Sequence, residues 1–337
     1  MIKKNNKKRS GSSQKSKGYL RAIRILTLPE KIAMVSTILI ILLAIVGPLL
    51  APYSAIKSNP AQRLQPPNGK NIMGTDENGI DVFSRVLCAP RMDVFIAISA
   101  TFTSVIIGTP IGLLVGFFEG GKSKFKSFLA SLILRLCDII QSFPVFVFAL
   151  TLVAISRPSA FNIILAVAFI NIPIFVRLVR GEVISLRERP YADSARIIGN
   201  SDLRLCFKHL LVNALSPVVV QISVVIGFSV LITAGLSFVG AGVQPPTPEL
   251  GAMISGGAKY MILGQWWPSF YPGIMLCLTV FSFATTGEAL RHLLEPPSAA
   301  EVGSYESHET DTDPSKAGIS PETGIVGGAN SHMPTIF

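Results

Sequence analysis

Two long stretches without any charged residue constrain this chain more than any other feature of its sequence. Residues 32–52 and 94–118 contain no Asp, Glu, Lys or Arg. A helix needs about 20 apolar residues to cross the hydrocarbon layer of a bilayer, where only structures that satisfy their own backbone hydrogen bonds are stable. Charged residues make up 15% of the chain, against about 25% in an average soluble domain. The sequence therefore predicts an all-α integral membrane protein.

Four further apolar segments raise the number of predicted membrane-spanning helices to six. They are residues 128–156, 160–176, 212–239 and 271–287. The first two are joined by a very short connection and are expected to form a tight pair. Arg135 and Asp138 lie three residues apart near the start of the first, so we expect them to share a helix face and to pair. Trp266 and Trp267 precede the last segment, and tryptophan favours the membrane interface.

The distribution of basic residues predicts the orientation in the membrane. Connections on the cytoplasmic side of a membrane protein carry an excess of Lys and Arg. With the N-terminus inside, 23 of the 30 Lys and Arg residues lie in parts predicted to be cytoplasmic and 7 lie in parts predicted to be outside. We therefore expect a multi-pass protein with both termini in the cytoplasm.

Composition divides the chain into three parts. Residues 1–31 form a basic, Ser-rich arm, residues 32–295 contain the six spans, and residues 296–337 are rich in Ser, Thr, Gly, Pro and acidic residues. The last part is too polar to bury a core, so we expect a disordered, acidic cytoplasmic tail. The arm could be a signal-peptide n-region, a contact for anionic lipid or a nucleic-acid tail. The charge rule favours an anchor on the inner side of the membrane, and no nucleic-acid partner is expected because aromatic residues are not interleaved with the basic ones.

One match to a phosphate-binding motif does not fit its context. Residues 116–123 read GFFEGGKS, which satisfies the pattern G-x-x-x-x-G-K-[ST]. A phosphate loop follows a short buried strand, whereas a long apolar run precedes this segment. We interpret it as a glycine-rich helix end. The four cysteines and four histidines are scattered along the chain, so we expect no catalytic residues, no metal site and no cofactor.

The polar connection at residues 177–211 has the residue pattern of short helices rather than of a loop. Pro190 fits the first turn of a helix, the following residues favour a helix, and Gly199 fits the position that ends one. Ser201 can cap a second helix, which begins at Asp202 and continues into the fifth span. A short surface helix is therefore predicted between two membrane-spanning helices.

The sequence of this surface helix resembles a known motif. The residues YADSARIIG, at 191–199, are similar to the "EAA…G" cytoplasmic loop of ABC importer permeases, and FKHLLVNALSP, at 207–217, resembles the dipeptide, oligopeptide and nickel branch of that family. Further resemblances occur in the expected order along residues 32–296. They are MGTDENGIDVFSRV (73–86), RLCDIIQSFP (135–144), LSFVGAGVQPPTPELG (236–251) and GEALRHLLEP (287–296).

This resemblance implies a fold, a function and a set of partners. It implies the type I ABC importer permease fold, with six transmembrane helices and a cytoplasmic coupling helix, in a bacterial inner membrane. The chain would be a non-catalytic subunit that forms half of a pathway for peptides. Its expected partners are a second permease subunit, two ATP-binding subunits, an extracytoplasmic substrate-binding protein, a peptide substrate and membrane lipid. The residues expected to couple it to the ATPase are Tyr191, Ala192, Asp193, Ala195, Arg196 and Gly199.

Several questions about the transported solute and its path stay open at this point. Nickel or another small solute is an alternative to peptides, and a self-sufficient secondary transporter or a membrane-anchored ATPase is an alternative to the permease subunit. Asp193 stands where the family usually has Glu, Ser194 where it has Ala, and Val212 where it often has Pro. Thr233 replaces an intramembrane Glu of related permeases, which weakens any transfer of their substrate preference. Residues that could line the path or gate it, or instead join neighbouring helices, are Thr233, Gly235, Ser237, Asn171 and Gln221.

Overall fold

The computed structural model describes residues 26–121 and 123–294, and this part of the chain is helical apart from turns and one isolated bridge between Thr75 and Asp81. Most of the arm at residues 1–31 and the whole tail at residues 296–337 lie outside the described residues. The α-helices are α2 (Leu28–Leu50), α3 (Val82–Phe118), α4 (Lys124–Ser142), α5 (Val145–Ser156), α6 (Ala160–Arg187), α7 (Pro190–Ile197), α8 (Asp202–Leu205), α9 (Leu211–Phe238), α10 (Leu250–Met261) and α11 (Trp267–Leu294). A short 3₁₀ helix, η1 (Pro60–Gln62), follows α2, and a π-helical turn, η2 (Cys206–Leu210), joins α8 to α9.

The helices confirm the prediction of an all-α membrane protein. Within the described residues, five helices are long and apolar enough to cross a bilayer, with the fifth predicted span continuous from Asp202 to Phe238. Helices α4 and α5 together provide a sixth candidate, bent by 93°. The number of spans agrees with the sequence, but the span predicted at residues 128–156 is not one straight helix.

The break between α4 and α5 follows from Pro144. Proline has no amide hydrogen to donate, and its ring disfavours helical geometry in the residue before it. That residue, Phe143, has φ −82° and ψ 142°, which is extended backbone. Residues 128–156 are uniformly apolar apart from Arg135 and Asp138, so composition alone predicts one span there and does not reveal the break at Pro144.

Several helices extend beyond the apolar runs that predicted them. Helix α3 begins at Val82 rather than near residue 94, because the Asp81 carboxylate caps it by accepting a hydrogen bond from the Ser84 amide at 2.8 Å. Helix α6 continues beyond the apolar run, to Arg187. Helix α10 was not predicted at all, since its 12 residues are too few to read as a span.

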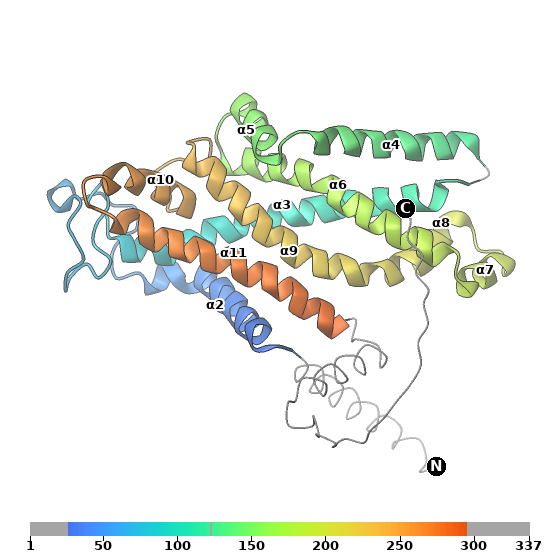
Figure 1. Cartoon of the computed structure of the whole chain (residues 1–337), viewed down its shortest axis with the longest axis horizontal. Helices are drawn as coiled ribbons and strands as arrows, with labels where there is room; N and C mark the ends of the chain where they lie inside the picture. Colours follow the sequence, from blue (N-terminus) through green and yellow to red (C-terminus); the bar gives the residue numbers. More distant parts are fainter. Residues whose placement is uncertain (1–25, 122, 295–337) are drawn as a thin grey trace, which may run out of the picture. The chain divides into compact units, whose positions relative to one another are not determined.

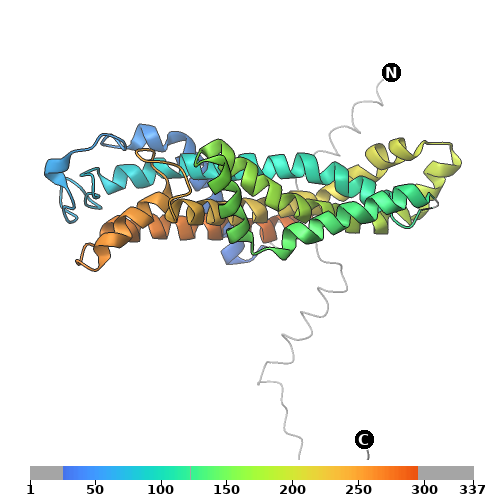
Figure 2. The ribbon, with the colours of Figure 1, turned by 90° about the horizontal axis from the view of Figure 1, so that it is seen from above.

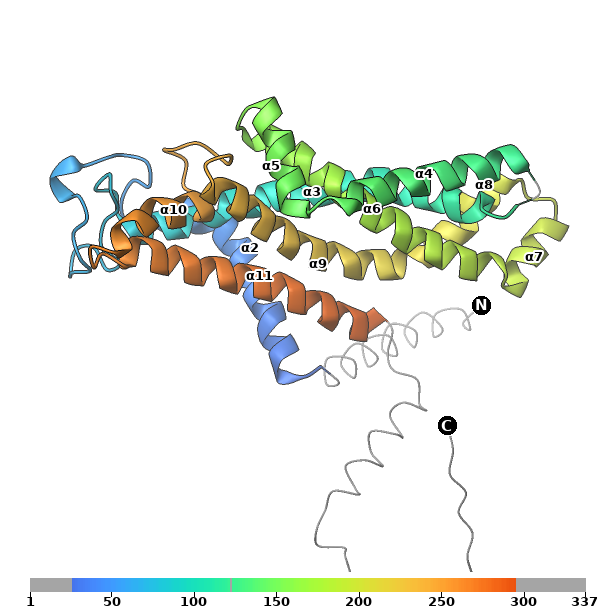
Figure 3. The same cartoon turned by 45° about the horizontal axis from the view of Figure 1, so that its top comes forward.

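The helices place two structurally different regions at opposite ends of the bundle (Figure 1). Helices α3, α6 and α9 run lengthwise and pack on one another, and α11 packs on α9 and α2. Helices α7 and α8 lie at one end, whereas α10 and the segment between α2 and α3 lie at the other. The view from above shows the same separation of the two ends (Figure 2). Helix α4 runs beside α3 and α6, and α5 turns away from it (Figure 3).

Three glycines allow α3 and α6 to approach backbone to backbone. Gly108, Gly112 and Gly116 are spaced four residues apart on α3, and a Cβ atom at Gly112 would lie 2.6 Å from the carbonyl oxygen of Val176 on α6. At Gly116 it would lie 2.8 Å from the carbonyl oxygen of Arg180. Small residues at this spacing are typical of close helix pairs in membranes. Gly116, the first residue of the phosphate-loop match, is therefore a helix-packing residue.

The expected pairing of Arg135 with Asp138 is wrong. The Asp138 carboxylate instead accepts a hydrogen bond from the guanidinium of Arg177, with 2.5 Å between Oδ1 and Nη2. Arg177 belongs to α6, which packs along α4. A pair three residues apart on one helix contributes only a few tenths of a kcal/mol, so a partner from the neighbouring helix displaces it easily.

The glycine contacts predict that Gly112→Ala destabilises the protein. The new methyl group has no room beside Val176, and such overpacking costs about 1–3 kcal/mol. Thermal unfolding of the full chain in detergent should show a lower midpoint. Gly181→Ala is the matched control, since nothing lies within 4 Å of a Cβ atom there, and replacing a helical glycine with alanine is normally neutral or stabilising. Equal midpoints for the two variants would contradict this account of the α3–α6 contact.

Candidate functional site

Helix α7 forms where the sequence predicts a short surface helix. Pro190 is its first residue, and the Ser194 hydroxyl donates to the Pro190 carbonyl at 3.0 Å. Gly199 follows the helix with φ +87°, a left-handed conformation that side chains other than those of Asn and Asp rarely adopt. The Asn200 side chain donates to the Ala195 carbonyl at 3.0 Å. The chain therefore turns sharply after α7 and enters α8.

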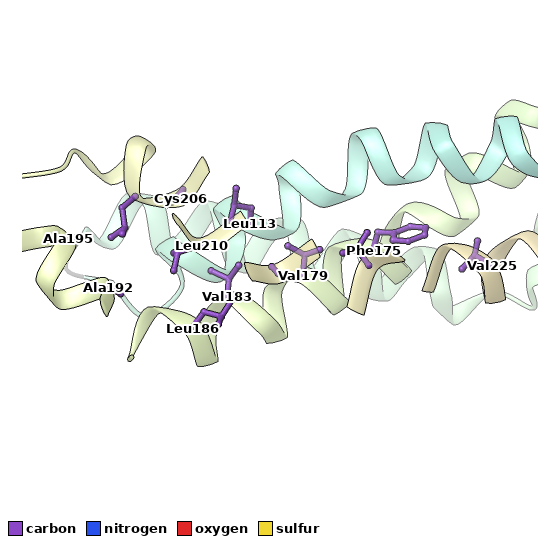
Figure 4. Close-up of a cluster of buried hydrophobic side chains, with 13 residues drawn as sticks. Leu113, Phe175, Val179, Val183, Leu186, Ala192, Ala195, Cys206, Leu210 and Val225 are labelled. Atoms are coloured by element: carbon purple, nitrogen blue, oxygen red, sulfur yellow. The ribbon is translucent and has the colours of Figure 1, made fainter. Parts of the chain in front are cut away.

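One side of α7 packs into the core. Ala192 and Ala195 are 0% and 7% exposed and join a cluster that includes Leu186 of α6, Leu205 of α8 and Leu210 of η2 (Figure 4). A methyl side chain lets the α7 backbone lie close to its neighbours. The two alanines thus position α7, and they do not contribute exposed surface to it.

The other side of α7 and the residues just after it expose large apolar side chains. Ile197 and Ile198 are 86% and 82% exposed, and Tyr191 is 36% exposed. Gly199 is exposed beside them. Because Ile197 and Ile198 lie outside the candidate membrane spans, their exposed side chains form a candidate surface for another protein. The side chains of Asp193 and Arg196, which we also expected at this surface, are not among those that the structure describes.

The connection from α7 into α9 is helical almost throughout. Ser201 has the extended backbone of a helix cap, with φ −65° and ψ 152°, but its hydroxyl makes no capping hydrogen bond. Helix α8 passes through the π turn η2 directly into α9. Helix α7 is joined to α6 on its other side by two residues, so short connections link it to both α6 and α9.

Two arginines of α6 form hydrogen bonds with the end of α3, close to the start of α7. Arg180 donates two hydrogen bonds to the Glu119 carboxylate, at 2.5 and 2.8 Å, and these hold the pKa of Glu119 below its ordinary value. One nitrogen of Arg187, Nη1, donates to the carbonyl oxygens of Gly116 and Glu119 at 2.9 and 2.7 Å. These carbonyls lack helical partners because α3 ends there. This clamp, formed by Arg180 and Arg187 at Glu119 and the last carbonyls of α3, has no local signal in the sequence.

Comparison with known proteins identifies the family. Residues 108–297 match the model of the binding-protein-dependent transport system inner membrane component, which covers more than half of the chain. Residues 30–67 match the N-terminal transmembrane domain of oligopeptide transport permease C. The chain belongs to the family of binding-protein-dependent transport permeases. This confirms the family that the sequence motifs indicate.

Individual relatives of the permease are similar over most of their length. A dipeptide transport system permease protein of Alkalihalophilus pseudofirmus is 38% identical over 79% of this chain and 86% of its own. A glutathione transport system permease protein of Pectobacterium atrosepticum is 36% identical over 77% and 84%. A probable D,D-dipeptide transport system permease protein of Escherichia coli is 36% identical over 78% and 86%. The permease is thus a non-catalytic, multi-pass inner membrane component of an ABC importer.

Most polar residues considered for the path lie inside the permease subunit. Asn171 of α6 is 1% exposed and donates to the Ser229 hydroxyl of α9 at 3.0 Å, which is a bond between neighbouring helices. Thr233 and Ser237 of α9 are 0% and 4% exposed. The Ser237 hydroxyl lies beside Gly242, in the segment between α9 and α10. Gly235 and Gln221 are half-buried, and a Cβ atom at Gly235 would lie 2.8 Å from the Phe146 ring of α5.

Proposed function

We propose that this permease forms half of a peptide pathway and that α7 receives the mechanical input from a separate ATPase. A second permease subunit would supply the other half. Two ATP-binding subunits would bind at the α7 end, and a substrate-binding protein would deliver solute at the α10 end. The observation that carries this proposal is the construction of α7, which is anchored by buried alanines and open through Ile197 and Ile198.

The charge distribution supports an orientation with α7 in the cytoplasm. The connection that contains α7 carries seven of the chain's Lys and Arg residues between positions 177 and 208. Positive charge in connections near the membrane favours the cytoplasmic side. ATP is available on that side, so a docking helix there can respond to an ATPase. Both termini would then also be cytoplasmic.

The contacts around α7 suggest how its displacement would reach the membrane-spanning helices. The connection to α6 is short, and α8 continues into α9, so displacement of α7 would displace both long helices. The Arg187 hydrogen bonds would also move the end of α3. Coupling requires that ATPase binding favour one arrangement of these helices over another. The buried polar residues between α6 and α9 lie along the boundary that such a change would open.

Peptides are the solute class that the relatives favour. Their names refer to dipeptides, glutathione and D,D-dipeptides, and the N-terminal match is to an oligopeptide permease domain. Nickel or another small solute is the second candidate, since the sequence motifs are shared with nickel importers.

The left-handed conformation of Gly199 predicts the effect of Gly199→Val. A β-branched residue there is strained by about 1–3 kcal/mol, although the space around it is free. We expect reduced transport and reduced transport-coupled ATP hydrolysis, with normal membrane insertion. Gly199→Asn is the matched control because asparagine tolerates this conformation. Full transport by a stably inserted Gly199→Val variant would refute the assignment of Gly199 to the coupling region.

The exposure of Ile197 predicts that replacing this residue weakens ATPase binding. Ile197→Ser should weaken the association of the permease with its ATPase subunits about tenfold, as expected for an apolar residue central to an interface. The measurement is co-purification from membranes followed by titration of the purified subunits. The matched control is Ile262→Ser, because Ile262 is 94% exposed at the opposite end of the bundle. Equal ATPase binding by both variants would argue against α7 as the docking helix.

The substrate class can be tested with the complete transporter in proteoliposomes. We expect ATP-dependent uptake of a labelled dipeptide that unlabelled peptides inhibit and free amino acids do not. Omitting the binding protein should abolish the uptake. Uptake of nickel without uptake of peptide would select the second candidate instead. Solute movement by this chain alone would contradict the whole proposal.

A further inference from the structure

Two carboxyl groups are buried side by side at the end of the bundle opposite α7. Asp93 lies on α3 and Glu249 immediately precedes α10, and each is 0% exposed. The two carboxyl groups face each other closely enough to interact. The Leu250 amide donates to Asp93 Oδ2 at 3.3 Å, and the Ala252 amide donates to Glu249 Oε2 at 2.7 Å. Both carboxyl groups therefore lie at the N-terminus of α10.

No basic side chain neutralises this pair within the described residues. Helix α9 and the segment at residues 239–248 contain no charged residue, and the charged residues of α11 lie at its other end. Arg91, two residues before Asp93, is exposed and lines a separate cavity of about 550 Å³ with Tyr53 and Thr247. Lys259 of α10 is exposed, and Arg85 is paired with Asp76. Two ionised carboxylates here would face each other with no cationic side chain beside them.

Two buried carboxyl oxygens also lack a donor, and the Ser237 hydroxyl beside Glu249 can donate to one of them but cannot serve both. Asp93 Oδ1 and Glu249 Oε1 are buried and accept no hydrogen bond from the described residues. Buried acceptors in native proteins are almost always satisfied. Two carboxylates cannot hydrogen-bond to each other, whereas a carboxylic acid can donate to a carboxylate. One proton between the two groups would provide the bond and remove one negative charge.

A metal ion fits this position less well than a proton does. The amides at the N-terminus of α10 point toward the carboxyl groups, and a helix N-terminus carries partial positive charge that disfavours a cation. The described residues also contain no group of three or more His, Cys, Asp or Glu side chains suited to holding a metal.

We propose that Asp93 and Glu249 form a proton-binding site, in which one shared proton holds α10 and the segment before it against α3. Burial without a cation raises the pKa of Glu249. At neutral pH the pair would keep its proton. Loss of that proton at higher pH would leave two adjacent buried carboxylates and weaken the contact between α10 and α3. The proposal does not depend on which solute the permease carries.

The first test detects the proton directly. Infrared spectra of the full-length permease in lipid nanodiscs at neutral pH should contain the C=O stretching band of a buried carboxylic acid. Asp93→Asn should remove this band, because the asparagine amide can donate to an ionised Glu249. Glu119→Gln is the matched control and should leave the band unchanged, since Glu119 is an ionised partner of Arg180. Absence of the band from the unmodified permease would overturn the proposal.

The second test follows the α10 contact as pH changes. The amides of Leu250 and Ala252 report it by hydrogen exchange, corrected for the intrinsic effect of pH on exchange. A group with a raised folded-state pKa stabilises the contact at low pH and loses this effect as pH rises through the folded pKa. Protection should therefore fall with rising pH, by up to tenfold per pH unit for one proton, and Asp93→Asn should flatten the profile.

A third variant separates proton binding from simple packing. Asp93→Leu keeps a similar volume but can neither accept from Leu250 nor share a proton. We expect low protection of α10 at every pH in this variant, whereas Asp93→Asn retains it. An unmodified profile already independent of pH, or identical pH dependence in the unmodified permease and Asp93→Asn, would show that no shared proton holds this contact.

Discussion

The close contact between α3 and α6 is the constraint on which the rest of the permease depends. Lipid cannot drive helices together as water does, so packing and hydrogen bonds must hold them. Gly108, Gly112 and Gly116 remove the side chains that would keep the two backbones apart. Helix α6 then extends past the end of α3, where Arg180 and Arg187 close the contact with hydrogen bonds. Helix α7 begins only three residues beyond this clamp, so its position is fixed by the same pair of helices.

The membrane helices could be predicted because their signal lies in composition over many residues. Lipid imposes a length of about 20 apolar residues on every span, and the apolar runs reveal it. The residues at which these helices begin and end were less predictable. Asp81 starts α3 well before the apolar run through a local capping bond, and Pro144 interrupts a run whose composition is uniform. Such effects depend on single residues, which a search for apolar segments averages out.

The sequence predicted which segment forms the candidate site, but not which side chains of that segment are buried or which distant residues contact one another. The motif at residues 191–199 located α7, its glycine terminator and the turn that follows. The sequence could not show that Ala192 and Ala195 face inward while Ile197 and Ile198 remain exposed, because this depends on where α6 and α8 lie. The clamp on Glu119 and the pairing of Asp93 with Glu249 join residues that lie 61 and more than 150 positions apart. No local spacing rule connects such residues.

The π turn at Cys206–Leu210 sets the rotation of the α8 side chains relative to those of α9, although the two helices are continuous. A π turn holds about one more residue than an α turn, and each residue of an α-helix turns the chain by about 100°. The side chains of α8 are therefore rotated about the common axis relative to an uninterrupted continuation of α9. Leu203 can thus lie on the exposed side while Leu210 stays in the core. The side chains that α8 exposes at this end of the permease are consequently not dictated by the side chains that α9 packs against its neighbours in the bilayer.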